Sequence, residues 1–307
     1  MAGEGEERAR GDGRPFVHRV LFSQGEPRFR AGWRLAIHAL MSAALVVALS
    51  VLGSILTGRA GVQFDWPWAM AYGVLPAALG VTLATWAARR VLDRRSFASL
   101  GLWIDGHAWH DLGMGFALGA AMVGAIFLVL WAAGWLTVTG WAGGAASTSR
   151  IVLGDLALFG LVGFSEELLS RGYHLTNLAD GLGLAWAVLL TSASFSLFHL
   201  GNPGAGAGSV AGILVAGLFF AYARIRTGRL WLPIGAHIGW NLALGLLGFP
   251  VSGLRVAALV SQRVVGPAWA TGGAFGPEAG VMAPLMVVLG TLAVRAYARN
   301  PAAHQVV

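Results

Sequence analysis

The chain has 307 residues, of which 56% are hydrophobic and only 11% are charged. Soluble domains carry about 25% charged residues, and a soluble fold of this length could not cover so much apolar surface with so few polar groups. The composition therefore excludes a soluble globular domain, a disordered chain and a coiled coil. It predicts an all-α, polytopic integral membrane protein, a helix bundle within the lipid bilayer.

The charge balance indicates topology rather than nucleic-acid binding. All 21 basic residues are arginines, and the net charge is +7. These arginines are scattered between apolar segments and form no basic face, so we expect no nucleic-acid partner. The chain has no cysteine, which excludes disulfides and thiolate metal sites.

The predicted domain organisation is simple. We expect a mobile cytoplasmic tail over residues 1–30, a single transmembrane domain over 31–300 and a C-terminal tail over 301–307. A membrane span needs about 20 mostly apolar residues. Eight segments qualify, and a further interfacial or re-entrant piece is expected over 254–266. The eight predicted spans are residues 35–57, 67–88, 112–136, 151–172, 184–200, 208–224, 230–248 and 280–298.

The arginines support an even number of spans. With eight alternating spans, the arginine clusters of the two tails and of the loops after spans two and six fall on one side, and few arginines fall on the other. Because cytoplasmic loops are enriched in Lys and Arg, we expect both termini in the cytoplasm. The Arg-only, Ala- and Gly-rich composition favours a bacterial cytoplasmic membrane.

The end of span four carries three ionisable groups, Glu166, Glu167 and Arg171. Ionisable side chains inside a membrane cost at least ~2.5–3.5 kcal/mol each on insertion scales and are functional candidates. Arg171 is four residues after Glu167, which suits a helical ion pair, while Glu166 lies about 100° away round the helix. One carboxylate could thus be a base and the other a structural partner. A structural ion-pair cluster at a span end is the alternative.

Two later spans carry further polar groups: Phe195 and His199 in span five, and His237 and Asn241 in span seven. His237 and Asn241 share one helix face and offer donors suited to an oxyanion. Each histidine could alternatively be a hydrogen-bonded core residue. Because Glu166 and His199 are equally far from a turn near 181–183, antiparallel helices would bring them to one level. His237 reaches that level if span four continues past Arg171 as a cytoplasmic helix.

These motifs, in this order, resemble those of the CPBP (Abi) family of CAAX prenyl endopeptidases of the Ras-converting type and bacteriocin-processing or immunity proteins. The resemblance covers about residues 100–250. Its three motifs are Glu-Glu-x-x-x-Arg, Phe-x-x-x-His and His-x-x-x-Asn, at Glu166, Glu167 and Arg171, then Phe195 and His199, then His237 and Asn241.

The resemblance implies an intramembrane endopeptidase that cleaves membrane-associated or CAAX-like substrates. Glu166 would activate a water with help from His199, and His237 and Asn241 would stabilise the oxyanion. Glu167, Arg171 and Phe195 would support the site. The residues themselves also fit a hydrolytic set. We favour a directly Glu-activated water and assign no metal. A zinc-type set of Glu166, His199 and His237 stays open.

Two other functions stay open at this stage. A non-catalytic scaffold or immunity factor could use the same pocket for binding, although the complete motifs favour an enzyme. A proton-coupled transporter could use the buried Glu and His residues as a relay, although the chain has no internal repeat. In every case the expected partners are the bilayer and a membrane peptide or protein.

Overall fold

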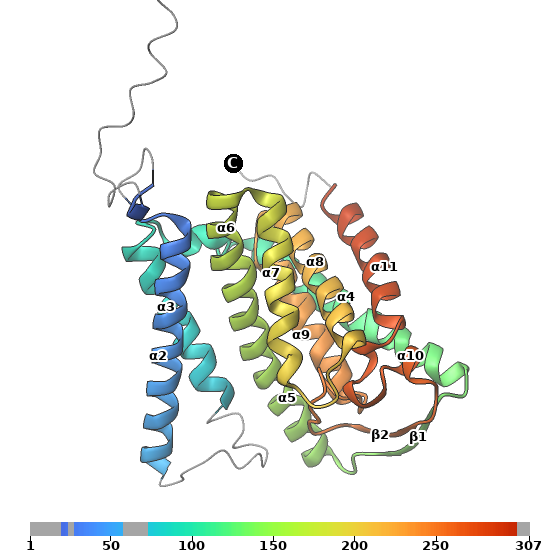
Figure 1. The fold of residues 1–307 in the computed structure, drawn as a ribbon. Coiled ribbons are helices and arrows are strands. Elements are labelled where there is room, and N and C mark those ends of the chain that lie inside the picture. The colour runs from blue at the N-terminus through green and yellow to red at the C-terminus, as the bar shows by residue number, and fades with distance from the viewer. Residues whose placement is uncertain (1–19, 24–27, 58–72, 300–307) are drawn as a thin grey trace, which may run out of the picture.

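The computed structural model describes residues 20–23, 28–57 and 73–299, and it is a helix bundle with one small β-ribbon (Figure 1). The all-α prediction is confirmed, because each of the eight predicted spans overlaps a helix of the described residues. Residues 1–19 and 24–27 of the predicted tail at 1–30, the predicted C-terminal tail at 301–307 and the start of span two at 67–72 lie outside the described residues. The eight helices are α2 (Ala31–Thr57), α3 (Leu75–Val91), α4 (Gly106–Ala132), α5 (Ala145–Glu167), α7 (Leu184–Phe198), α8 (Ala207–Thr227), α9 (Trp231–Leu246) and α11 (Met282–Tyr297).

Four helical segments in the described ranges are both long and apolar enough to cross a membrane on their own. They are Ala31–Leu56, Gly106–Ala132, Leu184–Gly201 and Ala207–Thr227. The helices α3, α5, α9 and α11 are shorter or less apolar, so the count of eight crossings stays a prediction. The chain is an integral membrane protein by these segments.

The helix that carries the glutamates continues past them, which was the condition for His237 to reach their level. After α5 comes a π-helical segment, Leu168–His174, and then α6 (Leu175–Leu182). Gly183 follows in a backbone conformation with φ +85°, which ends the helix and lets α7 return antiparallel. Short π-helical segments inside α-helices are frequent at functional sites. The turn at 181–183 thus sets the relative depth of Glu166 and His199.

Helices α4 and α9 touch through their backbones. A Cβ atom on Gly115 or Gly119 of α4 would lie 2.2 Å from a carbonyl oxygen of α9, and one on Gly235 or Gly239 of α9 would lie 2.1 Å from a carbonyl oxygen of α4. Reciprocal pairs of small residues four apart allow this close approach of membrane helices. The contact fixes α9, the helix that carries His237 and Asn241.

The β-ribbon and the segment around it were not predicted. Strand β1 (Leu136–Trp141) pairs antiparallel with β2 (Val260–Val264), where the sequence suggested a span end and an interfacial piece. Gly134, with φ +71°, ends α4, and the β-branched Thr137, Val138 and Thr139 that follow favour a strand. The ribbon lies at the lower end of the bundle in Figure 1. It anchors the long connection between α9 and α11.

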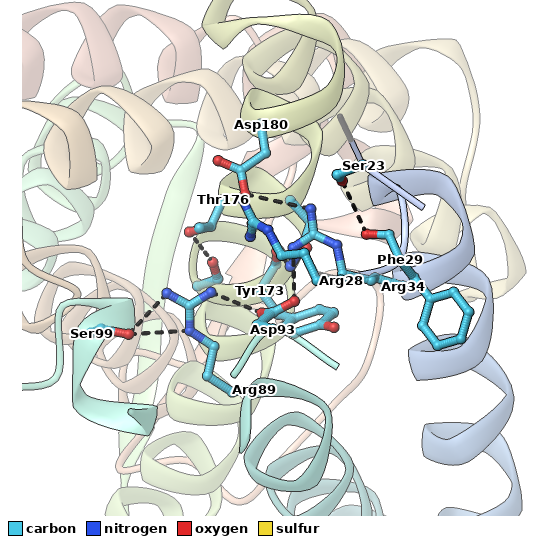
Figure 2. Close-up of polar contacts among 12 residues, drawn as sticks. Ser23, Arg28, Phe29, Arg34, Arg89, Asp93, Ser99, Tyr173, Thr176 and Asp180 are labelled. Atoms are coloured by element: carbon cyan, nitrogen blue, oxygen red, sulfur yellow. Dashed lines mark hydrogen bonds and ion pairs between the residues drawn. The ribbon is translucent and has the colours of Figure 1, made fainter. Parts of the chain in front are cut away.

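Helices α2 and α3 pair at one edge of the bundle in Figure 1, and a buried ion cluster joins them. Asp93 accepts one hydrogen bond at each carboxylate oxygen, from Arg34 and from Arg89, both 2.8 Å long. Ser99 accepts two more from Arg89 (Figure 2). We call Arg34, Arg89 and Asp93 the Asp93 cluster. Because Arg34 also contacts Asp180 of α6, this cluster links the N-terminal pair to the helix that carries the glutamates.

Candidate active site

Glu167 and Arg171 form the ion pair that their spacing predicted. Arg171 Nη1 donates to Glu167 Oε1 over 3.0 Å, and both side chains are fully buried. Arg171 Nη2 donates to the Gly217 carbonyl of α8 over 3.1 Å, and its guanidinium lies 4.2 Å from the centre of the Phe195 ring. A buried charge needs such partners. Glu167 is therefore locked into the packing between α5, α7 and α8.

Glu166 occupies a different environment, although it is the neighbouring residue. Its side chain is 35% exposed, and its Oε2 lies 3.8 Å from His237 Nε2. Within the described ranges, Glu166 Oε2 has no hydrogen-bond partner. Two adjacent carboxylates thus differ in burial and in bonding. Such a difference is what allows one carboxyl group to react while the other supports it.

His237 connects the two glutamates. Its Nδ1 donates to Glu167 Oε1 over 3.0 Å, and its ring stacks on Phe220 with centroids 5.0 Å apart and planes at 12°. These contacts fix the ring so that Nε2 faces Glu166. Phe220 was not predicted as part of the site, because an aromatic residue in an apolar span carries no distinguishing signal. We call Glu166, Glu167, Arg171 and His237 the glutamate cluster.

His199 and Asn241 stand beside this cluster. His199 Nδ1 donates to the Phe195 carbonyl over 2.8 Å, so the neutral imidazole keeps Nε2 free to accept a proton. Phe195 contacts both histidine rings, with centroids 5.0 Å from His199 and 6.0 Å from His237. Asn241 is buried one helical turn beyond His237. Between described side chains, no hydrogen bond or ion pair joins His199 directly to Glu166.

A cavity opens beside His237, between α4, α8, α9 and α11. Its wall is mostly apolar, and its polar members are His237, Trp240, Asn241 and Glu278. An apolar wall with a few convergent polar groups is typical of a ligand site. Trp240 and Glu278 were not predicted, although Glu278 is the only acidic residue after Asp180 in the sequence. The apolar lining comes from Met122, Ile213, Ala216, Phe219, Phe220, Ala236, Ala283 and Val287.

The alternative zinc-type set does not fit this arrangement. Across the part of the chain that the structure describes, no three His, Cys, Asp or Glu side chains are gathered so that they could hold one metal ion. Glu166, His199 and His237 therefore do not form a three-ligand group here. We derive no step through a metal.

One comparison with known proteins bears on this geometry. Residues 148–243 match the family model of the Rce1-like type II CAAX prenyl endopeptidases. The match includes all seven motif residues from Glu166 to Asn241, and it confirms the resemblance that the motifs predicted. It supports a membrane protease of the CAAX type as the general class of this protein. No curated protein matches the chain. The match ends before the connection that carries Glu278.

Proposed function

We propose that this protein is an intramembrane endopeptidase in which Glu166 activates the water that attacks a peptide bond. The observation that carries the proposal is the contrast between Glu166, which is partly exposed, and Glu167, which is fully buried and paired with Arg171; within the described ranges, Oε2 of Glu166 accepts no hydrogen bond. A carboxylate that keeps a free lone pair can accept a proton from water.

The other motif residues have complementary roles in this proposal. His199, with Nε2 free, shares the proton that leaves the water. His237 and Asn241 line the cavity wall and donate to the oxyanion of the tetrahedral intermediate. His237 already donates through Nδ1 to Glu167, so it donates through Nε2 only when the ring carries a second proton. The carboxylates of Glu166 and Glu167 are the counter-charges for that proton.

The cavity supports a membrane-associated substrate. Apart from its few polar groups, its wall is built from aliphatic and aromatic side chains of four helices. Such a wall favours a peptide with an apolar side chain or an attached apolar chain close to the cleaved bond. We infer a membrane peptide or CAAX-like protein tail as substrate. We also infer a bacterial cytoplasmic membrane as the site of action, with both termini in the cytoplasm.

The test uses the full chain purified in detergent, with quenched-fluorescent peptides that end in apolar residues, with and without a farnesyl group. We expect Glu166→Ala to lower the cleavage rate by about 10²–10⁴-fold, the contribution of general acid–base catalysis. Asp105→Asn, at the start of α4 and away from the site, is the matched control and should cleave at the wild-type rate. If the wild type cleaves none of these peptides, or Glu166→Ala cleaves as well as the control, the proposal is wrong.

A further inference from the structure

The connection between α9 and α11 brings a third carboxylate into the wall of the cavity. Glu278 lies in a short 3-10 turn, Pro277–Ala279, and its side chain is buried. The turn packs directly on α8 because Gly208 and Gly212 have no side chains: a Cβ on Gly212 would lie 1.8 Å from the Glu278 carbonyl oxygen. The fold thus holds Glu278 beside His237 and Asn241, outside the segment that matches the protease family.

Glu278 accepts hydrogen bonds from two different elements. Trp240 of α9 donates from Nε1 to Glu278 Oε1 over 3.3 Å. Ser252 donates from its backbone N–H to Oε2 over 2.5 Å, and its hydroxyl lies 3.1 Å from the same oxygen. Trp240 directly precedes Asn241, whereas Ser252 belongs to the connection. The carboxylate therefore fastens the connection to the helix that carries Asn241.

Ser252 extends this link to the end of α7. Its backbone has φ +47°, a left-handed conformation that is uncommon outside glycine. Its carbonyl oxygen accepts a hydrogen bond of 2.8 Å from Asn202 Nδ2, three residues after His199. Strained backbone persists only where its surroundings hold it. Glu278 on one side and Asn202 on the other hold Ser252 in this conformation.

The burial of the Glu278 carboxylate itself needs an explanation. A buried carboxylate is costly unless it is paired or hydrogen-bonded. A purely apolar side chain would fill the same space without that cost, so packing alone does not explain an acidic residue here.

We propose that Glu278 is a positioning residue of the active site, which holds the segment that follows His199 and the helix that carries Asn241 in a fixed relative position. This inference rests on the hydrolytic function proposed above. Glu278 acts through Trp240 on one side and through Ser252 and Asn202 on the other. Its loss would misplace the proton acceptor and the oxyanion donor relative to Glu166.

The test compares two buried carboxylates changed to amides in the full-length protein. Glu278→Gln should lower kcat by about 10–100-fold, because small misplacements of reacting groups have effects of this size, while KM changes little. Asp155→Asn is the matched control. Asp155 is fully buried in α5, and neither of its carboxylate oxygens has a hydrogen-bond partner within the described ranges. We expect Asp155→Asn to keep the wild-type kcat.

Trp240→Phe is the second variant, since it removes only the indole N–H and keeps the ring. Its effect on kcat should be smaller than that of Glu278→Gln. The fold-decrease in kcat of the double variant should be smaller than the product of the two single decreases, because both changes remove the same hydrogen bond. If Glu278→Gln lowers kcat no more than Asp155→Asn, the inference is overturned. If Glu278→Gln does not fold, an unchanged kcat in Trp240→Phe overturns it instead.

A measurement that needs no cleavage separates this inference from the proposed function. Amide hydrogen exchange of residues 199–204 and 250–254 should become faster in Glu278→Gln than in Asp155→Asn. If the exchange rates of both segments are unchanged in Glu278→Gln, Glu278 does not hold them, whether or not the enzyme is active. If the wild type cleaves no peptide, the proposed function fails, and the exchange rates still decide whether Glu278 holds these segments.

Discussion

The Asp93 cluster and the glutamate cluster are both groups of charges between helices, buried except for the partly exposed Glu166, but they differ in how completely their carboxylates are bonded. Both oxygens of Asp93 accept a hydrogen bond from an arginine. In the glutamate cluster, Glu167 Oε1 accepts two hydrogen bonds, while Glu167 Oε2 and Glu166 Oε2 have no partner within the described ranges.

This difference separates a structural ion network from a reactive one. Buried polar groups in folded proteins are nearly all hydrogen-bonded, and an exception needs an explanation. A network whose carboxylate is bonded at both oxygens fixes helices relative to one another, which is what the Asp93 cluster does for α2, α3 and α6. A network with free carboxylate oxygens keeps acceptors for water or substrate. The contrast therefore predicts opposite effects of mutation on stability and on activity.

The largest effect on stability is expected for Asp93→Ala. Removing the carboxylate leaves Arg34 and Arg89 as buried charges without their counter-charge, which typically costs about 3–5 kcal/mol. The free energy of unfolding in detergent should fall by this amount, while kcat of the remaining folded protein stays close to the wild-type value. A large loss of kcat in Asp93→Ala with an unchanged free energy of unfolding would contradict the structural role of the Asp93 cluster.

Glu167→Gln is expected to affect both properties. The amide that replaces the Glu167 carboxylate has one oxygen acceptor and no negative charge, so Arg171 loses its counter-charge. The two hydrogen bonds that Arg171 and His237 donate to Glu167 Oε1 then compete for that single oxygen. We expect about 1–3 kcal/mol of destabilisation, with a lower yield of folded protein and lower activity. Arg171→Ala should behave in the same direction. Unchanged yield in both variants would contradict the supporting role of this pair.

The smallest effect is expected at a fully bonded pair near the surface. Arg229 donates two hydrogen bonds of 2.8 Å to Asp105, and this guanidinium is the main reason that the pKa of Asp105 lies below its usual range. The Asp105 side chain is 42% exposed and that of Arg229 6%; because solvent screens the carboxylate, Asp105→Asn should cost about 1 kcal/mol.

The pH dependence of that small effect has a defined sign. A carboxyl group whose pKa is lowered by folding stabilises the protein above its unfolded pKa, about 3.9, and loses this contribution as the pH falls through the lower folded pKa. The difference in Tm between the wild type and Asp105→Asn should thus be present at pH 7 and shrink below about pH 4. If the difference in Tm grows as the pH falls below about 4, the Arg229–Asp105 pair does not stabilise the protein through the carboxylate charge.

Local features of the site could be predicted from the sequence. The four-residue spacing of Glu167 and Arg171 predicted an ion pair, and the structure confirms it. The helical extension beyond Arg171, a condition for His237 to reach the level of Glu166, is also present. These predictions depend only on helix geometry along one segment. The shared level of Glu166 and His237 also followed, because both positions could be counted from loops.

Contacts that depend on the path of the chain between α9 and α11 could not be predicted from helix geometry. Glu278 is the only acidic residue after Asp180, but its neighbours in sequence are Gly, Pro and Ala, which give no periodic signal. Its place in the cavity depends on the pairing of β1 with β2 and on the glycines of α8. Both are long-range features, and single-sequence patterns do not define them.

The most direct test of the central claim measures kcat and the free energy of unfolding in Glu166→Gln and Asp93→Asn side by side. The contrast between the clusters predicts that Glu166→Gln lowers kcat by about 10²-fold or more with little loss of stability, and that Asp93→Asn lowers stability with little loss of kcat per folded molecule. Wild-type cleavage by Glu166→Gln, or a catalytic defect in stable Asp93→Asn, would contradict the assignment of the reactive carboxylate.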